Sequence, residues 1–120
     1  MKNIYFVQVG FGFDGSVYLP YAVGTIIANC KKDNRINAEY NFADIIFCRE
    51  KLDSAEGKIA DPYIVAFSCS VWNSEYNKAL ARRIKDRYPD TIIVFGGHSV
   101  DESDTILQNE SYIDILMFGE

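Results

Sequence analysis

The sequence predicts an α/β fold built on a five-stranded parallel sheet. Five runs of apolar, β-branched and aromatic residues alternate with segments of helical periodicity, which is the pattern of parallel strands joined by helical crossovers. The run at 62–68 is continuous, as in a strand that is covered on both faces. The chain of 120 residues suffices for one core. With right-handed crossovers, the simplest layout is a flavodoxin-like (Rossmann-like) three-layer sandwich with strand order 2-1-3-4-5.

The first half of the chain predicts two strands separated by a helix. A strand at 3–9 stops at Gly10, and apolar residues then recur at helical spacing from Leu19 to Cys30. Pro20 suits the first turn of this helix, because its missing N–H would have no partner there. Cys30 is expected in the core. Alternating apolar and polar residues over 36–42 predict a second strand with one solvated side, at a sheet edge.

The second half continues the alternation. A short polar helix within 49–58 closes at Gly57, and the strand at 62–68 follows. Asn73 is expected to cap the next helix, which ends before Pro89. A strand at 91–97, a short helix at 101–109 and a strand at 113–119 complete the pattern. The buried face of the long helix is predicted to comprise Tyr76, Ala79, Leu80, Ile84 and Tyr88.

These elements form a single domain, residues 1–120. The last strand ends one residue before the end of the sequence, although a buried parallel strand needs a further element to cover it. The chain is therefore expected to be a fragment of a longer protein.

The composition excludes several classes of function. With 17 acidic and 12 basic residues the net charge is −5, whereas a nucleic-acid partner requires a dense positive face. No apolar run is long enough to span a bilayer and no signal peptide is recognised, so a cytoplasmic protein is expected. Three widely spaced cysteines form no C-x-x-C pair, so no metal site is predicted for this chain alone.

Ligands of open α/β sheets bind at the carboxyl ends of the strands, where the winding reverses. The crevice is therefore expected between the loops after strands one and three, within 10–16, 68–73, 96–99 and 119–120. These loops are rich in glycine and serine and carry few charges. They lack both the acid and lysine of a phosphate-accepting receiver and the G-x-S-x-G of a hydrolase. The lone histidine, His98, fits a turn residue better than a base, and no catalytic residue is assigned.

The loop "QVGFGFDGSV" contains Gly10, Gly12 and Gly15 at the spacing of a dinucleotide fingerprint. A dinucleotide-dependent oxidoreductase is therefore one alternative. Against it, the helical pattern begins only near Leu19, and no acidic residue ends the second strand, where a ribose would be bound.

From Pro62 onward the chain has an apolar strand running into "FS-x-x-x-W-N", a helix ending "K-x-x-x-P-D", a strand into "GG", and a last strand ending "GE". This pattern resembles the amino-terminal cobalamin-binding domain of radical S-adenosylmethionine enzymes. The segment "YLPYAVGTIIANC" is also similar to the first helix of that family. The resemblance covers nearly the whole chain.

This resemblance implies a cobalamin that lies across the carboxyl edge of the sheet with its nucleotide tail in the crevice. Ser68 falls on the serine of an S-x-L pattern, with Ser70 in place of the leucine, and Gly96 with Gly97 matches a double glycine that lets the tail pass. The loop after strand one lacks the D-x-H-x-x-G that supplies a histidine ligand to cobalt in related domains. The cofactor-binding residues implied in this way are Gly10, Phe11, Gly12, Ser68, Cys69, Ser70, Trp72, Gly96, Gly97, His98, Gly119 and Glu120.

The resemblance also implies a downstream catalytic domain, with a [4Fe–4S] cluster and S-adenosylmethionine, in a full-length methyltransferase or cyclase. This chain alone would bind its cofactor without catalysing a reaction. A second alternative remains open, in which the domain keeps the fold, binds no cobalamin and only packs against the catalytic domain.

Overall fold

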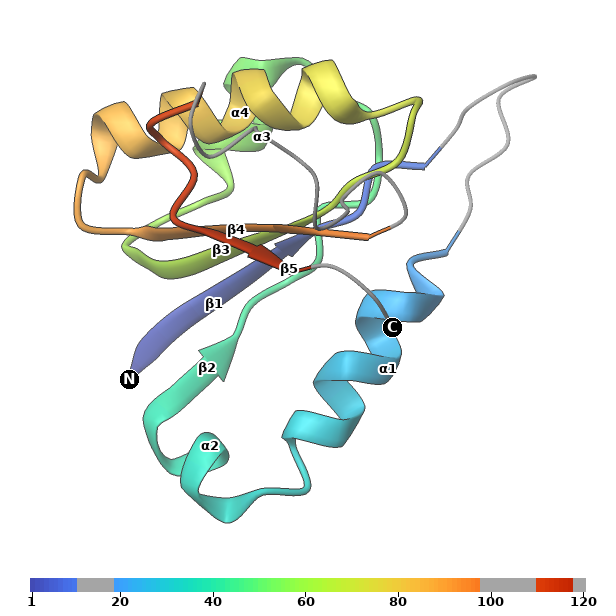
Figure 1. The fold of residues 1–120 in the computed structure, drawn as a ribbon. Helices are drawn as coiled ribbons and strands as arrows, with labels where there is room; N and C mark the ends of the chain where they lie inside the picture. Colours follow the sequence, from blue (N-terminus) through green and yellow to red (C-terminus); the bar gives the residue numbers. More distant parts are fainter. Residues whose placement is uncertain (11–18, 98–109, 118–120) are drawn as a thin grey trace.

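A computed structural model describes residues 1–10, 19–97 and 110–117. Their strands form one all-parallel five-stranded sheet with the order β2-β1-β3-β4-β5, which confirms the predicted α/β flavodoxin-like fold (Figure 1). The strands are β1 (Lys2–Val7), β2 (Tyr40–Phe42), β3 (Pro62–Ser68), β4 (Ile92–Gly96) and β5 (Ile115–Met117). The helices are α1 (Tyr21–Cys30), α2 (Asn34–Glu39), α3 (Leu52–Gly57) and α4 (Ser74–Arg87).

One face of the sheet lies under α3 and α4 and holds the main core (Figure 1). On this face Val65 and Phe67 of β3 are buried, and the rings of Phe67 and Phe95 meet with centroids 5.1 Å apart. Leu80 and Ile84 of α4 are fully buried, as predicted, whereas Tyr76, Ala79 and Tyr88 are half-buried. The predicted helical face is thus rotated slightly, because Asn77 and Ala81 also turn inward.

The opposite face is covered less completely by the described residues. In β3 its residues Ile64 and Ala66 are half-buried, although the continuous apolar run predicted cover on both sides. Helix α1 lies on this side of the sheet (Figure 1), and Val23 is its one buried residue. Cys30 is half-buried, so its predicted place in the core is wrong. Pro20 precedes the helix as its N-cap instead of lying within the first turn.

The predicted second strand is wrong over its first half. Residues 34–39 form helix α2, and only Tyr40–Phe42 pair with β1 at the sheet edge. The Asp33 side chain accepts a 2.8 Å hydrogen bond from the Arg35 N–H. The Asn37 N–H donates to the Asp33 carbonyl over 3.1 Å. This local capping stabilises a helical turn where the alternating pattern alone indicates a strand.

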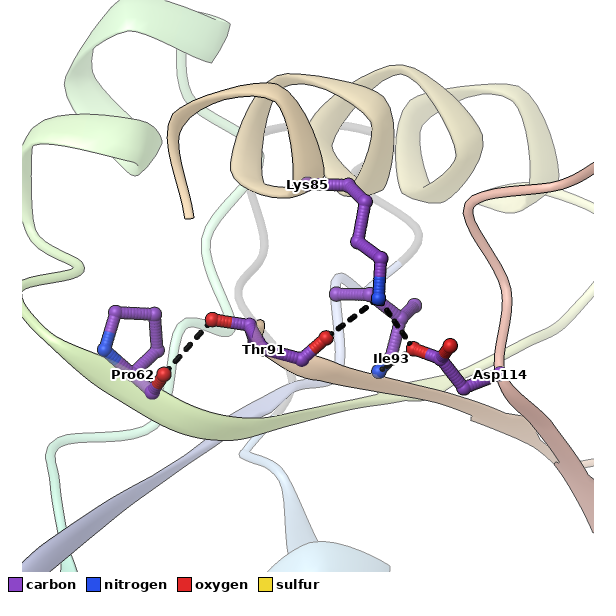
Figure 2. A network of polar contacts seen from close by, with 5 residues as sticks. All are labelled: Pro62, Lys85, Thr91, Ile93 and Asp114. Atoms are coloured by element: carbon purple, nitrogen blue, oxygen red, sulfur yellow. Dashed lines mark hydrogen bonds and ion pairs between the residues drawn. The ribbon is translucent and has the colours of Figure 1, made fainter. Parts of the chain in front are cut away.

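The amino edge of the sheet is fastened by a side-chain network that we call the clasp (Figure 2). The Asp114 carboxylate accepts hydrogen bonds from the Ile93 N–H at 2.8 Å and from Lys85 of α4 at 2.7 Å. Lys85 also donates to the Thr91 carbonyl at 2.7 Å, and the Thr91 hydroxyl donates to the Pro62 carbonyl at 2.7 Å. The clasp therefore joins α4 to the starts of β3, β4 and β5.

The predicted strands at 3–9, 91–97 and 113–119 are present in shortened form as β1, β4 and β5. The predicted helix at 101–109 lies outside the described residues. None of the described helices has the length and apolar character needed to cross a membrane.

Candidate functional site

A cavity of about 330 Å³ opens at the carboxyl edge of the sheet, between the ends of β1 and β3. This is the point where the strand order reverses, and ligands of such sheets bind there. The cavity is lined by Gln8, Val9, Gly10, Leu19, Pro20, Ser68, Ser70, Trp72 and Asn73.

Four of these lining residues, Gly10, Ser68, Ser70 and Trp72, are among the predicted site residues. Sequence reasoning missed the contributions of Gln8, Leu19 and Pro20, which lie at the end of β1 and the start of α1. Asn73 lies within the predicted crevice segment 68–73, although its own predicted role was that of a helix cap. A polar glutamine at the end of an apolar strand was the one signal for Gln8.

The remaining predicted residues are placed differently. Cys69 is buried, with 4% of its surface exposed, and lies outside the cavity lining. Gly96 and Gly97 also lie outside the lining, at the end of β4. Phe11, Gly12, His98, Gly119 and Glu120 lie outside the described residues.

Asn73 joins the two strands that border the cavity. Its side-chain amide donates to the carbonyl of Val9 at 3.1 Å and to that of Ser68 at 2.9 Å. Its Oδ1 accepts from the Ser70 N–H at 2.8 Å. Asn73 occupies the N-cap position of α4, yet its side chain makes no capping bond to that helix. The predicted position is therefore right, while its hydrogen bonds hold the crevice instead.

Asn77, one turn further along α4, braces this arrangement. Its amide donates to the Asn73 Oδ1 and to the Ser68 carbonyl, both over 3.2 Å, and to the Cys69 Sγ over 3.5 Å. Both asparagines are buried, at 2% and 0% exposure. Buried polar groups that bond one another define a geometry more narrowly than apolar packing does, so the crevice is formed before any ligand arrives.

The two glycines at the end of β4 serve different purposes. Gly97 has φ +109°, and a Cβ there would lie 2.8 Å from the Cys69 carbonyl oxygen and 2.9 Å from its nitrogen. A Cβ on Gly96 would meet only Met117, at an ordinary 3.5 Å. The fold itself therefore requires glycine at Gly97, because the Cys69 backbone crosses it.

The electrostatic character of the cavity is neutral. None of its nine described lining residues has an ionisable side chain, so they offer carbonyls, amides and hydroxyls instead of a general acid or base. Arg49 donates a hydrogen bond to the carbonyl of the lining residue Trp72 at 3.2 Å. Across the described ranges 1–10, 19–97 and 110–117, no group of three His, Cys, Asp or Glu side chains could hold a metal ion.

The start of α1 bears on the dinucleotide alternative. The helix begins at Tyr21, well beyond Gly15, so the third glycine of the fingerprint is not in its first turn. Moreover, the Val23 N–H of that first turn already donates to the Gln8 Oε1 at 3.2 Å. A pyrophosphate resting on this helix would need the glycine and the N–H group together, so the geometry disfavours this alternative.

Comparison with known proteins supplies the next constraint. Over 120 aligned residues, 99% of the chain, it is 31% identical to the cobalamin-dependent radical SAM methyltransferase TokK of Streptomyces tokunonensis. Over the same length it is 30% identical to the 2-(S-pantetheinyl)-carbapenam-3-carboxylate methyltransferase of Streptantibioticus cattleyicolor. The resemblance to cobalamin-dependent radical SAM proteins is confirmed. No known family profile matches the chain.

The matched segment is a small part of these relatives. The chain spans 17% of the length of each methyltransferase. The similarity is therefore to one segment of each relative.

Proposed function

We propose that this chain is the cobalamin-binding module of a longer radical S-adenosylmethionine enzyme of the methyltransferase or cyclase type. The observation that carries the proposal is the position of the cavity. It lies at the switch point of the sheet in a chain that is similar throughout to a cobalamin-dependent methyltransferase. When bound, cobalamin supplies a cobalt ion that can carry a methyl group, while a protein binds and orients it.

The described residues fit part of this cofactor. A cavity of about 330 Å³ is at the lower end of the usual range for small-molecule sites, which suits the nucleotide tail and not the whole corrin ring. The corrin would then lie over the rim, where Leu19, Val71 and Trp72 are 79%, 88% and 46% exposed. Apolar rim residues around a polar floor match a macrocycle that carries a polar tail.

Each wall would act in a distinct way on the tail. Ser68 offers a hydroxyl at the end of β3, and Gly10 allows close approach of the β1 end. Asn73 joins the two strand ends through its bonds to the Val9 and Ser68 carbonyls, and Asn77 donates to the same Ser68 carbonyl. In this proposal the cluster and S-adenosylmethionine belong to a downstream domain, and the chain alone catalyses no reaction.

The test is a titration of the purified chain with hydroxocobalamin, followed by corrin absorbance and by retention through a desalting column. Ser68→Leu should fill the crevice and abolish retention, while Ser54→Leu on the exposed surface of α3 serves as the matched control. Both variants should melt as the wild type does. A wild-type chain that changes no corrin absorbance and retains no cobalamin would overturn the proposal.

One observation favours a second candidate, a domain that packs against its catalytic neighbour without cobalamin. The exposed apolar residues at the rim, together with Met117 of β5 at 63% exposure, could be covered by protein instead of corrin. The same titration separates the two. In this second case no corrinoid is retained, yet Val71→Asp would still weaken the full-length enzyme.

A further inference from the structure

The segment that follows β2 is fastened to the end of β1. The Ile46 carbonyl accepts a hydrogen bond from the Gln8 N–H at 2.9 Å, and the Phe47 carbonyl accepts one from the Gly10 N–H at 3.3 Å. Gln8 and Gly10 both line the cavity. The chain beyond residue 47 therefore starts from a fixed point beside the cavity.

Arg49 extends from this segment to the loop 69–73 that follows β3. Its guanidinium donates to the Trp72 carbonyl at 3.2 Å, and its Cζ lies 5.6 Å from the centroid of the Tyr76 ring. The Tyr76 hydroxyl in turn donates to the Glu50 carbonyl at 2.9 Å. A planar guanidinium can lie over an aromatic ring and donate a hydrogen bond at its edge. Arg49 thus joins the loops after β2 and β3 and is supported by α4.

Trp72 is the residue through which this contact reaches the cavity. It lines the cavity and is 46% exposed, so it lies where the cavity opens to solvent. Its indole N–H donates to the Val9 carbonyl over 3.3 Å, which is long for a hydrogen bond. The neighbouring Val71 is 88% exposed and adds little packing to this part of the loop. Because Arg49 holds the backbone that carries the indole, losing Arg49 should let the indole move.

We propose that Arg49 is a positioning residue that acts through Trp72. It ties the loop after β3 to the loop after β2 and so sets the place of the indole at the rim of the cavity. This inference rests on the proposed function where it concerns corrinoid binding, and it adds a residue outside the cavity lining that controls how the ligand is seated.

The first test needs no corrinoid, because Trp72 is the one tryptophan of the chain and its fluorescence reports on the indole directly. For Arg49→Ala we expect emission at longer wavelength and stronger quenching by acrylamide, since the released indole meets more water. Arg87→Ala is the matched control and should change neither signal. Arg87 also lies over a tyrosine ring, 5.3 Å from the centroid of Tyr88, but at the last residue of α4.

Melting curves should show that both variants fold as the wild type does, because both arginines are exposed. A folded Arg49→Ala chain with the emission and quenching of the wild type would refute the role of Arg49.

The second test titrates hydroxocobalamin into the wild type, Arg49→Ala, Trp72→Ala and the double variant. We expect the dissociation constant to rise about fivefold in Arg49→Ala. The double variant should bind no more weakly than Trp72→Ala, because a residue that acts through Trp72 has no effect once the indole is gone.

The outcomes separate this inference from the function on which it rests. If the wild type binds hydroxocobalamin and the two losses add in the double variant, the cobalamin proposal stands and the positioning role of Arg49 is refuted. A wild-type chain that binds no hydroxocobalamin refutes the cobalamin proposal, while the fluorescence of Arg49→Ala still decides whether Arg49 positions Trp72.

Discussion

At the amino edge of the sheet the polar side chains of the clasp bond one another, whereas at the carboxyl edge polar groups are directed toward an open cavity. In the clasp, Lys85 donates hydrogen bonds to the Asp114 carboxylate and to the Thr91 carbonyl. The Asp114 carboxylate also accepts from the Ile93 N–H, and the Thr91 hydroxyl donates to the Pro62 carbonyl. At the carboxyl edge, Asn73 bonds the carbonyls of Val9 and Ser68 and the N–H of Ser70, beside a cavity that Ser68 and Ser70 line. One edge of the sheet is thus closed by its own hydrogen bonds, and the other borders an open cavity.

The comparison teaches that a buried polar residue should be judged by where its hydrogen bonds end. Thr91 and Asn73 are each 2% exposed, and both bond to backbone carbonyls of neighbouring strands. Bonds that end on the protein contribute to folding, while a polar group that faces an open cavity bonds water until a ligand displaces that water.

The largest effect is expected at the carboxyl edge, from Gly97→Ala. Its positive φ and the 2.8 Å approach to the Cys69 carbonyl oxygen should lower the free energy of unfolding by about 3 kcal/mol. Gly96→Ala is the matched control and should change it by less than about 1 kcal/mol, because its Cβ meets Met117 at 3.5 Å. Urea unfolding of both variants measures the difference. Equal stabilities would contradict the distinction between the two glycines.

A smaller loss is expected at the amino edge, from Asp114→Ala. The change leaves the Ile93 N–H and Lys85 without their shared acceptor, which should cost about 2 kcal/mol of unfolding free energy. Asp114→Asn keeps an acceptor for the Ile93 N–H and should lose about half as much. Corrinoid binding should persist in both variants, since the clasp lies at the far edge. Impaired binding in a folded variant would show that the two edges are coupled.

The smallest effect is a pH dependence at the amino edge. Burial opposes ionisation of Glu110, but the interactions with Arg82, whose hydrogen bond is 3.2 Å long, with Tyr112 and with the charge of Lys78 together outweigh it and lower the pKa of this carboxyl. A lowered pKa means that the stabilisation is complete above the ordinary glutamate pKa of about 4.3 and is lost as the pH falls through the lowered value. Glu110→Gln should therefore flatten the loss of stability on acidification, which urea unfolding at pH 7 and pH 3 would detect.

Glu110→Gln should change the free energy of unfolding less than Asp114→Ala does, because the Arg82 side chain is 54% exposed and its charge is screened by solvent. Added salt should reduce it further. An acid slope that is identical in wild type and Glu110→Gln would show that the pair does not stabilise the fold.

Local sequence patterns were enough to predict the five strands in chain order and the sheet order. Each pattern reports burial over a few turns or a few strand residues, and right-handed crossovers then leave few ways to arrange five parallel strands. The same rules placed Gly10, Ser68, Ser70 and Trp72 at the carboxyl edge, where they line the cavity. The alternating apolar and polar residues predicted a strand from residue 36, but the Asp33 cap stabilises helix α2 there and shortens the strand.

The tertiary structure alone decided which groups at that edge are bonded within the fold and which line the cavity. The bond from Asn73 to the Val9 carbonyl joins residues 64 positions apart, and the need for glycine at Gly97 arises from the distant Cys69 backbone. Such contacts depend on the path of the whole chain, so no local periodicity encodes them. The sequence by itself therefore determined the architecture and the position of the crevice. Only the folded chain showed that the Asn73 side chain bonds both strand ends that border the crevice.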